Sequence, residues 1–148
     1  MGMNVLPVYF DSCLVIYLVE EHPTFAPLVE TRLASQTQAA NVVIQVSALT
    51  EMECLVMPLR NRNQPLLDKF RQWFEKVEVL PVEREIFRRA SQLRADFAGL
   101  KTPDAIHLAA ALHHGCDEFW TNDNRLNHIA PNLVTDILSP IPSSQPSN

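Results

Sequence analysis

Short apolar segments alternate with longer stretches of helical periodicity along this chain. Five segments rich in β-branched or aromatic residues predict strands, at residues 5–10, 41–46, 77–80, 118–121 and 133–135. Between them, six stretches predict helices, at about residues 12–19, 24–35, 48–59, 65–74, 83–97 and 103–114. Strands that alternate with helices are typical of a mostly parallel sheet covered on both faces. We therefore predict an α/β protein, a three-layer α/β/α fold whose sheet has about five strands.

The clearest predicted helix start is at Thr102-Pro103-Asp104. We expect Thr102 to be the N-cap, because its hydroxyl can accept a hydrogen bond from the first turn. Pro103 suits the first helical position, and Asp104 suits the first turn.

The length and composition predict one globular domain with a short tail. A chain of 148 residues with 47% hydrophobic content matches a single core, which we place at residues 1–138. The segment 139–148 holds three prolines and four serines, so we expect it to be disordered. We expect a cytoplasmic protein without membrane partners, because neither a signal peptide nor an apolar span is evident. The three scattered cysteines predict buried thiols.

The formal net charge of −5 argues against a nucleic-acid partner, because phosphate binding depends largely on Lys and Arg. Basic residues nevertheless gather in the middle of the chain, at Arg60, Arg62, Lys69, Arg71, Lys76, Arg84, Arg88, Arg89 and Arg94. Such clustering would guide RNA toward an acidic cleft filled by cations. The alternative is a solvated helix face paired with Glu83, Glu85 and Asp96, and the sequence leaves both open.

Four carboxylates lie near the predicted strand ends or helix starts. Asp11 directly follows the first strand, and Glu53 lies in the second turn of the helix after the second strand. Asp104 lies in a first turn, and Asp123 follows the fourth strand. Ligands of open α/β sheets bind at the carboxyl ends of the strands. We therefore treat these four acids as candidate site residues.

Helical geometry separates Glu53 from its neighbour Glu51. At about 100° per residue, the apolar residues of this helix predict one stripe, formed by Leu49, Met52, Val56 and Leu59. Glu53 borders this stripe and Glu51 points away from it. We therefore expect Glu53 to line a cleft and Glu51 to meet water.

Four convergent acids need a cation. Two carboxylates ~4 Å apart repel by roughly 4 kcal/mol at an effective dielectric constant near 20. Oxygen ligands without Cys or His at zinc-like spacing favour a hard ion, Mg²⁺ or Mn²⁺. Such an ion can bind a phosphodiester and activate water. Phosphodiester hydrolysis is the reaction that this chemistry predicts.

Each of these residues also has a structural interpretation. Asp104 is a common first-turn residue stabilised by the helix dipole, and Asp123 could be a turn former. Asp11 is harder to explain in this way, because a carboxylate among apolar residues is costly unless it is paired or metal-bound. Ser12 and Thr121 flank acids and either support them by hydroxyl hydrogen bonds or serve as small caps. We expect His107 to be packed and hydrogen-bonded rather than catalytic.

Four segments of the chain resemble the PIN domain, and within it the VapC-like toxins of type II toxin-antitoxin systems. They are Tyr-Phe-Asp-Ser at 9–12, Val-Ser-Ala-Leu-Thr-Glu-Met-Glu at 46–53, Leu-Lys-Thr-Pro-Asp-Ala-Ile-His-Leu-Ala at 100–109, and Gly-Cys-Asp-Glu-Phe-Trp-Thr-Asn-Asp at 115–123. The resemblance extends to about Asp136. It implies that Asp11, Glu53, Asp104 and Asp123 bind Mg²⁺ or Mn²⁺ for endoribonuclease activity. It also implies homodimerisation and inhibition by a small VapB-like antitoxin.

Three functions remain open at this point. The first is a metal-dependent endoribonuclease that acts as the toxin of such a pair. The second is a PIN-like module that binds RNA or protein without cleavage, against which the intact set of acids argues. The third is a PIN nuclease in RNA processing that has no antitoxin.

Overall fold

The computed structural model describes residues 4–141. Its elements are β1 (Val5–Phe10), α1 (Ser12–Val19), α2 (Phe25–Thr37), β2 (Asn41–Ser47), α3 (Ala48–Arg60), α4 (Gln64–Glu75), β3 (Glu78–Leu80), α5 (Arg84–Asp96), α6 (Thr102–His113), β4 (Glu118–Thr121), the 3-10 helix η1 (Asn124–Leu126) and β5 (Val134–Asp136). The predicted fold class is confirmed, and each predicted element is found with its ends within about two residues.

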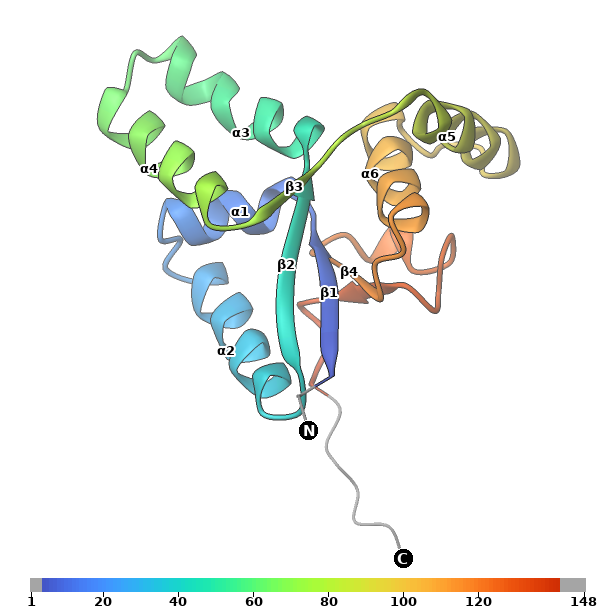
Figure 1. Ribbon diagram of the computed structural model, residues 1–148, viewed down its shortest axis with the longest axis horizontal. Helices are drawn as coiled ribbons and strands as arrows, with labels where there is room; N and C mark the ends of the chain where they lie inside the picture. The colour runs from blue at the N-terminus through green and yellow to red at the C-terminus, as the bar shows by residue number, and fades with distance from the viewer. Residues whose placement is uncertain (1–3, 142–148) are drawn as a thin grey trace, which may run out of the picture.

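The five strands form one parallel sheet in the order β3-β2-β1-β4-β5. All carboxyl ends therefore meet at one edge of the sheet. The central strand β1 pairs with β2 on one side and with β4 on the other. Helices α1 to α4 cover one face, and α5 and α6 cover the other (Figure 1).

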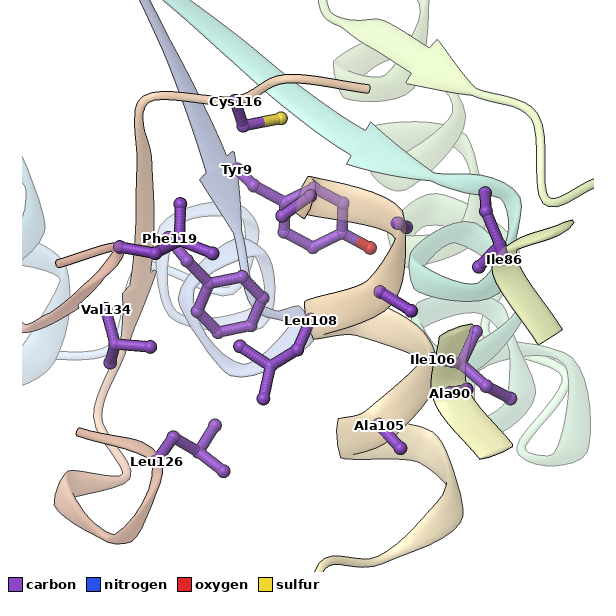
Figure 2. Close-up of a cluster of buried hydrophobic side chains, with 14 of the residues drawn as sticks. Tyr9, Ile86, Ala90, Ala105, Ile106, Leu108, Cys116, Phe119, Leu126 and Val134 are labelled. Carbon is purple, nitrogen blue, oxygen red and sulfur yellow. The ribbon is translucent and has the colours of Figure 1, made fainter. Parts of the chain in front are cut away.

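Alternation along β1 and β4 divides the core between the two faces, as the period of a strand requires. Val8, Phe10 and Trp120 are buried against the helices α1 to α4. Tyr9 and Phe119 point the other way and stack with ring centroids 5.2 Å apart. Figure 2 shows this second cluster, in which Leu108 of α6 lies next to the Phe119 ring and to which Ile86 of α5 also belongs. The sheet is thus fixed on both faces, which makes its carboxyl edge a rigid platform.

Two local predictions were wrong. The N-cap of α6 is Lys101, and Thr102 is already helical. In α3, the residues that face the core are Thr50, Cys54 and Pro58. Met52 and Leu59 of the predicted stripe instead face outward, each 54% exposed, whereas Leu49 is partly buried against the core.

The end of the described chain is attached to α2. The buried Arg32 guanidinium donates a 2.6 Å hydrogen bond from Nη2 to the carbonyl of Ser139. Residues 142–148 lie outside the described part, so disorder of the tail stays a prediction. None of the helices found between residues 4 and 141 is long and apolar enough to cross a membrane.

Candidate active site

Asp11 stands at the carboxyl end of the central strand, where it is the N-cap of α1. Its Oδ1 accepts a hydrogen bond from the Ser12 backbone N–H at 2.8 Å. Its Oδ2 accepts one from the Thr121 hydroxyl, also at 2.8 Å, which ties the end of β1 to the end of β4. Thr121 is fully buried, so the carboxylate of Asp11 is held by the start of α1 and by the end of β4.

Glu53 is held at the same edge by two side chains. Its Oε1 accepts a hydrogen bond from the Ser12 hydroxyl at 2.7 Å and lies 2.5 Å from His107 Nε2. Burial alone would raise the pKa of Glu53, but these hydrogen bonds and the His107 charge hold it below its ordinary value. Glu51 is partly buried, contrary to the expectation that it meets water. Glu53 is nevertheless the glutamate that reaches the site.

His107 lies beneath Glu53 in a buried polar network. The ring is 1% exposed, and its Nδ1 lies 2.6 Å from the Tyr9 hydroxyl. That hydroxyl donates to Ser47 Oγ at 2.8 Å, and burial raises the pKa of Tyr9. The prediction of a packed, hydrogen-bonded histidine is confirmed. Sequence reasoning did not predict its partner, because Glu53 lies on another helix.

Asp104 projects from the first turn of α6 and is half-buried. Burial raises its pKa, and the nearby charges of Asp11 and Asp123 raise it further. No hydrogen bond to its carboxylate is found among residues 4–141. Asp104 is therefore the acid of the set whose charge is least compensated.

Asp123 follows β4 and caps η1. Its carboxylate accepts bonds from Arg125 Nε at 2.9 Å and from Nη2 at 2.6 Å. Arg125 is the main reason that the pKa of Asp123 is lowered, and Lys101 adds a smaller effect. This arginine is a site residue that the sequence analysis missed, although its spacing of two residues from Asp123 was visible.

The four acids share the sheet edge without forming a closed ion cage. Within the described ranges, the one set of three ligand atoms lying within 4.8 Å of one another is Glu83, His113 and His114. That set is at the opposite end of α6 from Asp104, roughly 14 Å away at 1.5 Å per residue. It cannot share an ion with the four acids. Mg²⁺ suits the acids, because it keeps several waters and needs only one or two carboxylates.

Two cavities flank the acids. One, of about 240 Å³, is bordered by Asp104 and Asp123 and by the loop that joins α5 to α6. The other, of about 360 Å³, lies between α1, α3 and α4 and reaches Glu53. Asp104 and Asp123 therefore border one cavity, and Glu53 borders the other.

The remaining candidate chemistry of the sequence lies elsewhere. The basic residues of the middle of the chain are all exposed, and Arg88 pairs with Glu85 within α5. This pair matches the solvated-face interpretation. Burial raises the pKa of Cys13 and of Cys54 to about 12 each, which keeps both thiols protonated and unreactive.

Comparison with known proteins agrees with this geometry. A family model described as the PIN domain matches residues 8–131. The VapBC2 complex of Rickettsia felis, solved with a fragment of promoter DNA, has a TM-score of 0.73 at 12% identity, covering 88% of this chain and 98% of that one. A toxin-antitoxin complex from Klebsiella pneumoniae has a TM-score of 0.66 at 25% identity, covering 87% and 97%.

A third solved structure is VapC20 of Mycobacterium tuberculosis, a toxin that cleaves the sarcin-ricin loop. It has a TM-score of 0.66 at 14% identity, covering 83% of this chain and 95% of that one. Comparison with curated protein sequences gives no match. Because the family model covers most of the chain, this protein belongs to the PIN domain family, and the solved structures that it resembles include VapBC toxin-antitoxin complexes.

Proposed function

We propose that this protein is a divalent-metal-dependent endoribonuclease and the toxin of a toxin-antitoxin pair. Asp11, Glu53, Asp104 and Asp123 would hold Mg²⁺ or Mn²⁺, and Ser12 and Thr121 would support two of these acids. The observation that carries the proposal is geometric: Asp104 and Asp123 border one cavity, and the Thr121 hydroxyl ties Asp11 to the end of the strand that Asp123 follows. Burial raises the pKa of Asp104, the charges of Asp11 and Asp123 raise it further, and a bound cation would relieve that repulsion.

Two of the four carboxylates are fixed by neighbouring hydrogen-bond donors. Thr121 and the Ser12 backbone fix both oxygens of Asp11. Ser12 and His107 fix one oxygen of Glu53 and leave Oε2 without a donor among the described residues. Such preorganised carboxylates need no rearrangement when substrate binds. The divalent ion itself, when bound, supplies Lewis-acid activation of water and of the phosphodiester.

The antitoxin would cover the outward face of α3. Met52 and Leu59 are each 54% exposed there, and exposed apolar surface of this kind marks an interaction site. Met57, 52% exposed, lies on the flank of the helix nearer Glu53. The cavity of about 360 Å³ between α1, α3 and α4 adjoins this face and includes both Met57 and Glu53. A segment with apolar side chains bound in this cavity would reach the acids. The resemblance to solved toxin-antitoxin complexes supports this partner.

The test is cleavage of purified total RNA by the purified protein with Mg²⁺ or Mn²⁺, and with EDTA. We expect discrete fragments only with metal, and none from Asp11→Asn or Asp104→Asn. Asp117→Asn is the matched control, because Asp117 is exposed and is not among the four acids. Its cleavage should equal that of the unsubstituted protein.

The other functions predict other outcomes. RNA that is bound without cleavage, irrespective of metal, would contradict the nuclease and favour a binding module. Cleavage by a protein whose gene has no antitoxin neighbour, and whose expression does not slow growth, would contradict the toxin role and favour RNA processing.

A further inference from the structure

The cavity beside Asp104 and Asp123 has two kinds of wall. One is apolar and aromatic, with Phe97 and His128 in edge-to-face contact at 6.0 Å between ring centroids and with Leu126 beneath them. The other is polar, with the cations Lys101 and Arg125 beside the carboxylates of Asp104 and Asp123. A volume of about 240 Å³ is below that of most pockets for drug-sized ligands. The occupant is therefore small, and partly flat and apolar, with a polar end that meets Lys101 and Arg125.

Arg125 keeps free N–H donors although it already binds the carboxylate of Asp123. Its Nε and Nη2 donate to Asp123, and Nη1 has no partner within residues 4–141. A guanidinium carries five N–H donors in a rigid fork, so this one retains free donors toward solvent. Its side chain is 68% exposed. The pair with Asp123 fixes the direction of the fork at the rim of the cavity.

The loop between α5 and α6, which lines the cavity, contains a glycine in a left-handed conformation. Gly99 has a φ of +92°, and a Cβ at this position would meet nothing within 4 Å. The glycine is therefore required by its left-handed conformation and not by crowding. The neighbouring Ala98 is exposed and also lines the cavity. The space above this loop is left unfilled by the protein.

We infer that this cavity binds one nucleotide of single-stranded RNA, next to the phosphodiester that is cut. The base would lie against Phe97 and His128, and its phosphate would meet Lys101 and Arg125. Aromatic faces bind unstacked bases, whereas an A-form duplex keeps its bases inside. Asp104 and Asp123 line both the cavity and the acidic site, so an occupant is adjacent to the acids. This inference rests on the proposed function for the position of the cut.

The experiment measures the binding of a fluorescent single-stranded oligoribonucleotide by anisotropy. The protein carries Asp11→Asn, which prevents cleavage during the measurement. Ala98→Leu would fill the cavity without adding an aromatic ring, and His128→Ala would remove one base contact. We expect each to weaken binding about tenfold, within the range measured for losing one stacked base. Ala95→Leu is the matched control, because Ala95 is exposed on α5 and does not line this cavity.

The phosphate contact has its own measurement. Lys101→Met should weaken binding and lower the slope of log affinity against log salt by about one, as expected for one lost phosphate contact. Lys76 is exposed at the end of α4 and does not line this cavity. The Lys76→Met variant should therefore bind RNA as tightly as the Asp11→Asn parent. Equal binding of single strand and duplex by the parent, or unchanged binding of single strand by Ala98→Leu and His128→Ala, would overturn the assignment.

Failure of this inference can be told from failure of the proposed function. Cleavage by the unsubstituted protein tests the nuclease, and binding by the Asp11→Asn series tests the cavity. A protein that cleaves RNA while its cavity variants bind and cleave normally contradicts the inference alone. A protein that never cleaves RNA but loses affinity in the cavity variants contradicts the nuclease and leaves the nucleotide site standing.

Discussion

His107→Leu should separate the function of the site from the stability of the fold. His107 is 1% exposed, and leucine has a similar volume, so the substitution leaves little cavity. The Tyr9 hydroxyl keeps Ser47 and Thr50 as partners and is not left unpaired. We therefore expect the free energy of unfolding to change by no more than about 1–2 kcal/mol.

The effect on the site should be larger. The variant removes the hydrogen bond between His107 Nε2 and Glu53 Oε1, and a bond to a charged group contributes about 1.5–3 kcal/mol. Glu53 then keeps only Ser12. Loss of a residue that orients a metal ligand typically costs about 10- to 100-fold in metal affinity or activity. We expect a decrease of that size in Mn²⁺ affinity, measured by calorimetry or by electron paramagnetic resonance.

Two further variants make this prediction specific. His107→Gln retains an N–H donor near Glu53 and should recover part of the affinity. His22→Leu changes a histidine that accepts hydrogen bonds from the Thr24 and Phe25 backbone N–H groups and from none of the four acids, and should leave Mn²⁺ binding unchanged. A folded His107→Leu protein with unchanged Mn²⁺ affinity would refute the positioning role.

Asp104→Asn should stabilise the metal-free protein at pH 7, because the raised pKa of Asp104 means that its charged form is unfavourable in the fold. The penalty is fully present above the folded-state pKa and disappears as pH falls toward the ordinary value, so the two proteins should converge in acid. Urea unfolding in EDTA measures the difference, and equal stability at pH 7 would contradict it. Arg125→Gln removes the main cause of the lowered pKa of Asp123, so that pKa should rise in a carbon-13 NMR titration; an unchanged value would mean that the pair does not form in solution. Met57→Glu changes a side chain that is 52% exposed, and we expect a change in stability within about 0.5 kcal/mol together with loss of antitoxin in co-purification. Retention of the antitoxin would place its binding site elsewhere.

The sequence was informative wherever the relevant interaction is local. The strands and helices could be predicted because the apolar period changes from two to 3.6 between short punctuating segments. Asp11 and Asp123 could be selected because they follow β1 and β4 directly, and parallel strands bring such positions together at one edge.

The error in α3 came from the assumption that an apolar stripe on a helix faces the core. In α3 most of the apolar stripe is exposed and the residues that pack inward are Thr50, Cys54 and Pro58. A surface reserved for a partner has the same sequence pattern as a buried surface. Glu53 rather than Glu51 contacts Ser12 and His107, but the stripe argument used to choose it is not supported by the structure.

The parts of the site that the sequence could not give are tertiary. His107 meets Glu53 across 54 residues and meets Tyr9 across 98. The periodicity of a sequence does not encode such contacts, because they depend on how α3 and α6 meet at the carboxyl edge of the sheet. The pair of Asp123 and Arg125 is local in the sequence. An arginine two residues after an acid in a turn is common, however, and only the cavity beside the pair suggests a ligand-binding role for it.

The central claim is that the four acids make this protein a nuclease. Its most direct test is growth after induction of the unsubstituted protein, Asp11→Asn, Asp104→Asn and the control Asp117→Asn, with total RNA from each culture run on a gel. We predict growth arrest and discrete RNA fragments for the unsubstituted protein and for Asp117→Asn, and normal growth with intact RNA for the other two. Equal growth and intact RNA in all four cultures would contradict the claim.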